Sequence, residues 1–240
     1  MDFDRYSRQV PMPELGSEGQ KKIMNSSALV IGAGGLGSSL LYCLAGAGVG
    51  KIGFMDDDIV SLSNLNRQFL HFEKDIGSLK VNSAYEKLHA FNSSVALVPI
   101  PEKLTADNID KFIPDYDIVI LAVDCIASRY IVNDACCKYN KPLVNGGVNG
   151  MTGMLNLVIP GMTPCLRCVS EENDISDRST ESFAPIVSTI SAIESHLAIL
   201  TLLGKPPLPF DKVVYFSGID CTFHQIICDR RKGCPACSAL

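Results

Sequence analysis

The sequence has no surplus of basic residues, no long apolar run and no internal repeat. Its 26 acidic residues exceed its 21 lysines and arginines, and the net charge of −5 argues against a general nucleic-acid binder, which needs basic surface for phosphates. No run of roughly 18 apolar residues predicts a membrane span. The acidic first residues lack the apolar region of a signal peptide, so we expect a cytoplasmic protein with no membrane or nucleic-acid partner.

The 240 residues contain 10 cysteines, which in the cytosol would be reduced thiols or metal ligands rather than disulfides. Four of them form two CxxC pairs, and each pair can present both thiolates to one ion. We predict a structural zinc site that ties the C-terminus to the middle of the chain, with the ligands Cys165, Cys168, Cys234 and Cys237. The other six are predicted to be small buried hydrophobes: Cys43, Cys125, Cys136, Cys137, Cys221 and Cys228. The four histidines show no ligand spacing and are assigned no chemistry.

The order of apolar segments predicts an α/β fold. An apolar run at 28–31 leads into a glycine-rich turn, a helix to about residue 47 and a second strand at 51–56, which is a βαβ unit. Further strands are predicted at 95–100, 117–123, 142–145, 154–159, 213–217 and 222–229, and helices at 78–91, 127–139 and 185–203. We expect a Rossmann-like, doubly wound, mostly parallel sheet that becomes mixed or antiparallel toward the C-terminus. Residues 57–77 and 170–183 are predicted to be functional loops.

The turn after the first strand reads Gly-Ala-Gly-Gly-Leu-Gly, which is the dinucleotide-binding fingerprint. Gly32 allows the tight turn, Gly34 lets the backbone approach a phosphate, and Gly37 lets the helix pack against the strand. The first N–H groups of the helix can then bind an anion. Asp56, 19 residues beyond Gly37, would accept hydrogen bonds from a ribose. The pattern predicts nucleotide binding, with a merely tight turn as the alternative.

The fingerprint alone suggests NAD, but three residues favour a triphosphate. Arg67 and Lys80 would supply positive charge, and Asp124, at the end of a buried strand, could hold magnesium through oxygen ligation. Hydride transfer needs neither a metal nor these cations. Each residue also has a simpler interpretation: Arg67 could pair with a surface carboxylate, Lys80 could be an ordinary first-turn lysine, and Asp124 could cap the following helix.

Several motifs together resemble the ThiF/MoeB/HesA adenylyltransferases, the bacterial relatives of ubiquitin-activating enzymes. They are RYSRQ at 5–9, GAGGLG at 32–37, AGVG at 47–50, DDD at 56–58, LSNLNRQ at 62–68, GSLK at 77–80 and the two CxxC pairs. The resemblance covers nearly the whole chain. It implies one adenylation domain over 1–240, with an N-terminal arm at 1–26, a nucleotide-binding half at 27–150 and a carrier-binding, zinc-containing half at 151–240.

The resemblance also implies an activity. Such enzymes bind ATP and Mg²⁺ and adenylate the C-terminal glycine of a small ubiquitin-like sulfur carrier with a Gly-Gly tail, for thiamine, molybdopterin or related biosynthesis. Carried over by position, Asp56 would bind the ribose, Asn64, Arg67 and Lys80 the phosphates, and Asp124 the magnesium ion. The full nucleotide-binding set is Gly32, Gly34, Gly35, Gly37, Asp56, Asp58, Asn64, Arg67, Gln68 and Lys80. Arg8 would act as an arginine finger in the partner subunit of a homodimer, or else form a surface ion pair in a loose arm.

Two departures from the family pattern stand out. The usual Cys-Thr-Asp-Asn stretch at the magnesium site reads Ala-Val-Asp-Cys at 122–125, which keeps the aspartate and loses the asparagine. Residues 170–183 contain no cysteine, although many relatives use one there for a covalent step. The chain is therefore predicted to hand its adenylate to a separate persulfide donor, such as a cysteine desulfurase or a rhodanese.

Three other functions remain open at this point. A nicotinamide-dependent oxidoreductase could use the same glycine fingerprint, although no hydride-site acid is evident. A non-catalytic carrier-binding protein could have lost its activity together with the asparagine and the loop cysteine. An enzyme of the same family could adenylate another carboxylate or amide, such as a peptide terminus or a modified tRNA base.

Overall fold

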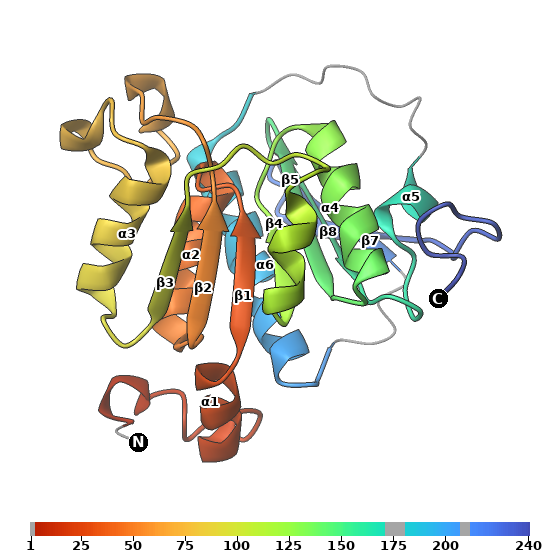
Figure 1. The fold of residues 1–240 in the computed structure, drawn as a ribbon, viewed down its shortest axis with the longest axis horizontal. Helices are drawn as coiled ribbons and strands as arrows, with labels where there is room; N and C mark the ends of the chain where they lie inside the picture. The colour runs from red at the N-terminus through yellow and green to blue at the C-terminus, as the bar shows by residue number, and fades with distance from the viewer. Residues whose placement is uncertain (1–2, 171–180, 207–211) are drawn as a thin grey trace.

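A single twisted sheet of eight strands organises the molecule (Figure 1). The computed structural model describes residues 3–170, 181–206 and 212–240. The strand order is β3-β2-β1-β4-β5-β6-β7-β8. The strands are β1 (Ser27–Ile31), β2 (Lys51–Met55), β3 (Ala96–Ile100), β4 (Ile118–Leu121), β5 (Leu143–Asn149), β6 (Thr152–Val158), β7 (Lys212–Ser217) and β8 (Thr222–Ile227). In this order the strands from β3 through β2, β1 and β4 to β5 pair in parallel, and those from β5 to β8 pair antiparallel. This arrangement confirms the predicted fold class.

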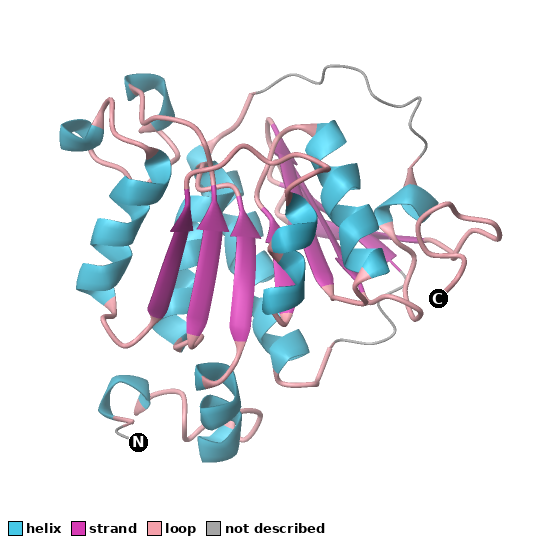
Figure 2. Ribbon diagram, in the orientation of Figure 1, coloured by secondary structure: helices cyan, strands magenta, loops and turns pink. Residues whose placement is uncertain are grey.

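Helices cover both faces of the parallel half (Figure 2). They are α1 (Gly16–Met24), α2 (Gly35–Ala47), α3 (Lys80–Phe91), α4 (Ile126–Lys138), α5 (Leu166–Val169) and α6 (Ala184–Leu202), with short 3₁₀ turns between them. Alternate strand residues point to opposite faces, and this divides the core in two. Val30 and Ile120 pack on the face of α2, α3 and α6, whereas Leu29 and Leu121 pack on the face of α4.

The strand order creates a switch point between β1 and β4. The chain builds β1, β2 and β3 in one direction across the sheet and then returns to place β4 on the other side of β1. The two neighbouring strands align Ile31 with Leu121. Ligands of open α/β sheets bind at the carboxyl edge beside such a point, because the following loops diverge there. The glycine loop after β1 and the Asp124 segment after β4 both lie at this edge.

Helix α6 is the one helix of the described residues that is long and apolar enough to cross a membrane. Half of its apolar window is buried inside the protein. It packs against α2 and β5, and Ile190 and Ala198 are completely buried there. Its apolar composition is explained by this central position, because a helix covered on most sides needs few polar residues.

The prediction that six cysteines are buried is wrong for four of them. Cys136 and Cys137 are buried in α4, as predicted, but Cys43, Cys125 and Cys221 are exposed and Cys228 is intermediate. Apolar neighbours in the sequence do not determine burial, because a residue can lie on the outer face of a helix or at its end. Cys43 is an outward residue of α2, and Cys125 is the N-cap of α4.

Candidate active site and metal centre

The glycine loop turns tightly between β1 and α2. Gly32 has a φ of 103°, which favours glycine, and a Cβ there would lie 2.5 Å from the Ala122 carbonyl oxygen. A Cβ on Gly37 would lie 2.2 Å from the Gly32 carbonyl oxygen. A larger residue at position 32 would therefore push the loop away from β4, and a larger residue at position 37 would push α2 away from the loop. The two glycines bring the N-terminus of α2 beside the end of β4, and Gly34 is the N-cap of α2.

Asp56 follows β2 and supports the glycine loop directly. Its Oδ2 accepts the Ala33 N–H at 2.8 Å, and its Oδ1 accepts the Asp58 N–H at 2.9 Å. Burial raises the pKa of Asp56, while the Ala33 N–H and Lys80 act in the opposite direction. Each carboxylate oxygen retains a lone pair, so the side chain can accept hydrogen bonds from a ribose as well.

Lys80 is the first residue of α3 and is only 5% exposed. Its Nζ pairs with Asp58 Oδ2 at 2.8 Å, and Asp58 itself is exposed. The same two residues are also joined by a backbone hydrogen bond, in which the Lys80 N–H donates to the Asp58 carbonyl at 2.9 Å. The nearly buried ammonium also acts against the rise in the pKa of Asp56, so it places positive charge near the carboxylate that supports the glycine loop.

The loop at 57–77 carries the remaining predicted phosphate ligands. Asn64 Oδ1 accepts the Ser61 N–H, so this side chain closes a 3₁₀ turn. Arg67 pairs with no carboxylate of the described residues: its guanidinium donates to the Ser63 carbonyl and to Asn66 Oδ1. Its side chain lies over the glycine loop, since a Cβ on Gly35 would be 3.5 Å from Arg67 Cγ.

Gln68 is the second side chain over the loop. It is 4% exposed, and a Cβ on Gly34 would lie 3.4 Å from its Nε2. Its buried Oε1 has no hydrogen-bond partner among the described residues. A buried amide oxygen without a partner costs free energy, so a donor from a bound ligand would stabilise this arrangement. The position of Gln68 over Gly34 and its unpaired amide oxygen together fit a bound nucleotide.

Asp124 lies three residues beyond the end of β4 and is exposed. It does not cap α4, since the N-cap is Cys125. The thiol of Cys125 receives hydrogen bonds from the Ser128 and Ala127 N–H groups, and these lower its pKa. An exposed carboxylate beside the glycine loop has the oxygen ligands that Mg²⁺ prefers. The site therefore fits a magnesium ion held by Asp124 with water and phosphate oxygens.

Beneath Asp124 lies a buried ionisable pair that the sequence did not reveal. Arg129 donates to Asn145 Oδ1 and to the Val123 and Gly146 carbonyls, which joins the end of β4 to β5. Glu194 of α6 is completely buried, and neither carboxylate oxygen has a hydrogen-bond partner within residues 3–170, 181–206 and 212–240. Burial raises the pKa of Glu194 to about 8, although the charge of Arg129 opposes this. A Cβ on Gly146 would overlap Glu194, so glycine is required there.

His71 was also missed, because its sequence neighbours show no ligand spacing. The structure buries it between the glycine loop and α3, with Nε2 2.9 Å from the Ala33 carbonyl oxygen and Nδ1 2.8 Å from Ser83 Oγ. Nothing in the sequence pairs residue 71 with residue 33, since that contact exists only after β1 and α3 have packed together.

Arg8 does not lie in the nucleotide crevice of its own chain. The N-terminal arm lies at the opposite end of the sheet from the glycine loop (Figure 1). It is anchored there by Tyr6, which is 4% exposed and packs against Gly48 at the C-terminus of α2. The 13 residues of α2 separate the two ends by about 20 Å. Arg8 is exposed and has no ion pair among the described residues, so the surface-pair interpretation is not supported, and neither is a loose arm.

The four CxxC cysteines come together as one cluster, and one sulfur from each lies within 4.8 Å of all the others. The Sγ–Sγ separations are 3.8 Å for Cys165 and Cys168, 3.6 Å for Cys165 and Cys234, and 3.4 Å for Cys168 and Cys237. A tetrahedral zinc ion with Zn–S bonds near 2.3 Å needs sulfurs about 3.8 Å apart. The cluster therefore fits the predicted zinc site.

The zinc cluster is fastened to the sheet through α4. Asp134 accepts hydrogen bonds from Nε and Nη2 of Arg167, which lies between the first pair of cysteines, at 2.7 to 2.9 Å. Asn133 accepts the Leu166 N–H at 2.8 Å. The metal site thus lies on the side of α4 away from the glycine loop, which favours a structural role over a catalytic one.

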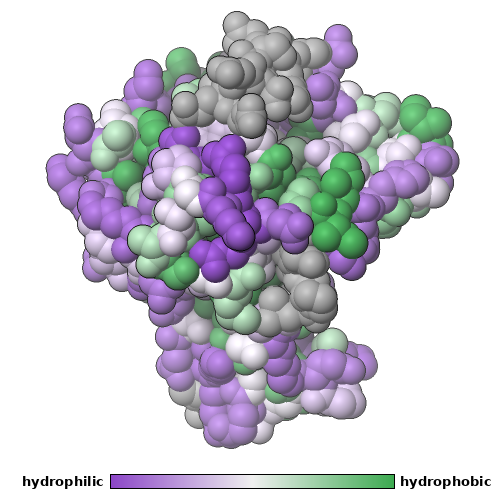
Figure 3. Space-filling model, turned by 90° about the vertical axis from the view of Figure 1, so that its right-hand side faces the viewer, coloured by the Kyte–Doolittle hydropathy of each residue, from purple (hydrophilic) through white to green (hydrophobic). Residues whose placement is uncertain are grey.

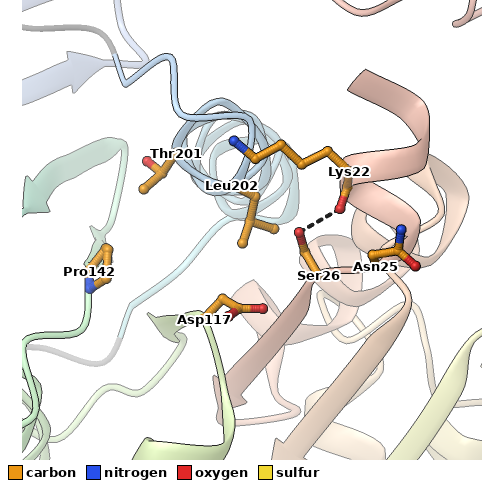
Figure 4. A pocket seen from close by; sticks show the side chains of 7 residues that line it. All are labelled: Lys22, Asn25, Ser26, Asp117, Pro142, Thr201 and Leu202. Atoms are coloured by element: carbon orange, nitrogen blue, oxygen red, sulfur yellow. Dashed lines mark hydrogen bonds between the residues drawn. The ribbon is translucent and has the colours of Figure 1, made fainter. Parts of the chain in front are cut away.

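A separate hollow opens at the amino edge of the sheet (Figure 4). It is lined by Lys22, Asn25, Ser26, Asp117, Pro142, Thr201 and Leu202. Its polar groups are used by the fold: Lys22 Nζ donates to the Leu203 carbonyl, and Asp117 accepts the N–H and hydroxyl of Ser27. It lies at the opposite edge from the glycine loop and is not part of the nucleotide crevice.

Comparison with known proteins gives a consistent result. The chain is 37% identical to the adenylyltransferase and sulfurtransferase MOCS3 of Aedes aegypti, over 99% of this chain and 56% of that protein. It therefore spans about half the length of that relative. It is 32% identical to the SAMP-activating enzyme E1 of Haloferax volcanii, over 98% of this chain and 88% of that protein.

The fold recurs in solved structures. E. coli MccB with ATP has a TM-score of 0.83 and 26% identity, covering 91% of this chain and 68% of MccB. The complex of MccB with MccA has a TM-score of 0.86 over 99% of this chain and 75% of that chain. The family model described as ThiF family matches residues 6–236. With the glycine loop, the switch point and the cysteine cluster where that family's motifs predict them, the match shows that this chain belongs to the ThiF family.

Proposed function

We propose that the protein is an ATP-dependent adenylyltransferase that activates the C-terminal glycine carboxylate of a small ubiquitin-like sulfur carrier. The observation that carries the proposal is the convergence at the β1/β4 switch point. Gln68 and Arg67 lie over the glycine loop, Asp56 supports it from β2, and the Lys80–Asp58 pair follows on α3. The similarity to MOCS3 and to the SAMP-activating enzyme E1 supports the same reaction.

The chemistry suits these residue types. A terminal carboxylate is ionised near pH 7, so its oxygen can attack the α-phosphorus of ATP without a general base. A carboxylate–phosphorus bond forms, the bond to the bridging oxygen of the β-phosphate breaks, and pyrophosphate leaves with the electron pair. What the protein must supply is alignment and neutralisation of the phosphate charge. Lys80 and Arg67 provide that charge beside the N–H groups of the α2 N-terminus.

Asp124 would hold the magnesium ion, which supplies further neutralisation of the phosphates. We expect Asp124→Ala to abolish carrier-dependent exchange of radiolabelled pyrophosphate into ATP while leaving the thermal unfolding temperature unchanged, since Asp124 is exposed. Glu86→Gln, an exposed substitution on α3, is the matched control. Full exchange in Asp124→Ala would refute its role, and no exchange by the native protein with any Gly-Gly carrier would refute the proposed function.

We propose a homodimer in which Arg8 serves the crevice of the second copy, and the position of Arg8 supports this proposal. The arm holds Arg8 too far from its own crevice, and exposed apolar residues on the 57–77 loop offer a surface for a second copy: Ile59, Leu62, Phe69, Phe72 and Ile76. Arg8→Ala and Asp124→Ala chains should each be inactive alone. A one-to-one mixture should regain about a quarter of native exchange, because half the dimers are mixed and each has one complete site. No recovery after verified subunit exchange would exclude Arg8 as a group supplied in trans.

The carrier has a surface to dock on at the antiparallel end of the sheet. Figure 3 views this side, where apolar side chains interrupt the polar surface. The edge strand β8 is exposed along its length, including Phe223, Ile226 and Ile227, and Ile219 of the preceding turn is 80% exposed. An apolar edge strand without a neighbour can pair with a strand of another protein. Introducing a charge on this edge, Ile226→Glu, should weaken carrier binding without affecting ATP binding.

The sulfur would come from a separate persulfide donor, such as a cysteine desulfurase or a rhodanese, since 170–183 has no cysteine. That loop lies largely outside the described residues. Thiamine and molybdopterin biosynthesis are both open as the pathway. A cytoplasmic location suits this chemistry, because a reducing compartment keeps the zinc ligands as thiols.

A peptide terminus is the second candidate substrate. The complex of MccB with MccA covers 99% of this chain at a TM-score of 0.86, so the same fold acts with a partner that is not named as a carrier. Pyrophosphate exchange stimulated by a synthetic peptide but by no Gly-Gly protein would favour this candidate. Tight NAD(P) binding without exchange would instead favour an oxidoreductase, and carrier binding without turnover a non-catalytic protein.

A further inference from the structure

The peptide group of Ala33, inside the glycine loop, is held from both sides. Its N–H donates to Asp56 Oδ2 at 2.8 Å, and its carbonyl oxygen lies 2.9 Å from His71 Nε2. Asp56 was expected at this site, but His71 was not. Both partners are fixed by the fold, so the orientation of the two peptide planes around Ala33 is fixed as well.

The proton on His71 can be placed from its partners. A carbonyl oxygen only accepts, so Nε2 must carry the hydrogen that bonds to Ala33. Burial lowers the pKa of His71, so the ring carries a single proton near pH 7. Nδ1 is then an acceptor, and the single proton of the Ser83 hydroxyl is shared between Nδ1, 2.8 Å away, and Asp75 Oδ2, 3.1 Å away.

A buried network behind Ser83 keeps the ring in place. Lys87 Nζ donates to Ser83 Oγ at 2.8 Å and forms a close ion pair with Asp75. Asp75 Oδ2 also accepts the Phe72 N–H at 2.7 Å. His71, Asp75, Ser83 and Lys87 are each at most 9% exposed. Since the network draws on α3, it ties the glycine loop to the helix that begins with Lys80.

The orientation of the Ala33 carbonyl decides where the next N–H points. In a trans peptide the C=O of one residue and the N–H of the following residue point in opposite directions. The Ala33 carbonyl points inward to buried His71, so the Gly34 N–H points away from it. Gly34 is the N-cap of α2, and no hydrogen bond to its N–H is found among the described residues.

We propose that His71 is a positioning residue of the phosphate site: by binding the Ala33 carbonyl, it holds the Gly34 N–H toward the nucleotide phosphates. The inference rests on the nucleotide binding of the proposed function but not on the identity of the carboxylate substrate. Without His71, the Ala33–Gly34 peptide can rotate. Part of the binding free energy of the phosphate is then used to fix the orientation of the Gly34 N–H, and the affinity for ATP falls.

The test compares ATP with adenosine, which lacks phosphates, by calorimetric titration in the presence of Mg²⁺. His71→Leu replaces the imidazole with an apolar side chain of similar size and removes the donor. It should weaken ATP binding about tenfold, because a hydrogen bond to a charged group is misplaced, and change adenosine binding less than about twofold. His71→Gln, whose amide nitrogen can donate to Ala33, should restore most of the ATP affinity.

Several results would overturn the inference. Equal losses for ATP and adenosine in His71→Leu would show a purely structural residue, and native ATP affinity in the folded variant would exclude any role. If His71→Leu does not fold, Ser83→Ala decides, since it frees the ring by removing the Nδ1 partner, and unchanged ATP affinity there would count against the proposal. Native protein that binds ATP but fails carrier-dependent exchange would reject the proposed function alone.

Discussion

The completely buried Glu194 gives the structure a pH dependence that one isosteric substitution should remove. Glu194 lies in the middle of α6 with its carboxyl group against Gly146 of β5, and neither carboxylate oxygen has a hydrogen-bond partner in the described part of the chain. Glu194→Gln keeps the size and shape of the side chain and removes its ability to ionise. The expected effect is on the slope of stability against pH rather than on stability at one pH.

The magnitude follows from the pKa of Glu194, which burial raises from 4.5 to about 8. Between these values the folded protein keeps a proton that the unfolded chain has released, so the free energy of unfolding falls as pH rises. The whole window corresponds to about 5 kcal/mol, at 1.36 kcal/mol for each pH unit. The stabilising contribution is complete below about pH 4.5 and is lost by about pH 8.

Urea denaturation at pH 5, 6, 7 and 8.5 measures this slope. Relative to Glu194→Gln, the native protein should lose roughly 4 kcal/mol of unfolding free energy between pH 5 and pH 8.5. Any free-energy cost of burying the uncharged amide of Glu194→Gln does not vary with pH, so it cancels when the two pH values are compared. Glu86→Gln on the exposed face of α3 should follow the native pH profile within about 0.5 kcal/mol.

Two outcomes would refute the reasoning. Parallel pH profiles for the native protein and Glu194→Gln would show that Glu194 does not change protonation in this range. Parallel profiles with the variant several kcal/mol less stable than the native protein at every pH would show in addition that Arg129 keeps Glu194 ionised, so that the substitution leaves a buried charge without its partner.

Two further effects are expected from substitutions in the glycine loop and the metal centre. Gly37→Ala should lower the free energy of unfolding in urea by about 1–3 kcal/mol, because its Cβ would lie 2.2 Å from the Gly32 carbonyl oxygen. Gly46→Ala in the same helix is the control and should be neutral or stabilising, since its Cβ would lie 3.5 Å from Phe91. Equal stability of the two variants would contradict the packing argument. Cys234→Ser should retain less than about half an equivalent of zinc and unfold about 4–8 °C lower, assuming a loss near 2 kcal/mol, whereas exposed Cys221→Ser should keep its metal and melting temperature. Full zinc retention by Cys234→Ser would exclude that residue as a ligand.

Local sequence patterns were sufficient for the elements and for part of the site. Apolar strands separated by helical segments predicted the parallel half, because both faces of such strands are buried. The glycine fingerprint placed the turn after β1, and the CxxC spacing placed the zinc ligands, because each knuckle holds its two sulfurs together locally. The helix at Gly16–Met24 escaped prediction, since it buries only Gln20 and Ile23 and its apolar pattern is correspondingly weak.

Contacts between distant segments were decided by the tertiary structure alone. The sequence named Arg8 as a candidate arginine finger, but only the fold shows that the N-terminal arm lies at the far end of α2 from the glycine loop. Likewise, residue 71 meets residue 33, and residue 129 meets residue 194, because strand order brings their elements together. Periodicity reports which face of an element is buried, not what that face will touch. For this reason the sequence determined the fold class, the nucleotide loop and the metal ligands of this protein. The burial of Glu194 and the clamp on Ala33 depend on packing across the β1/β4 switch point.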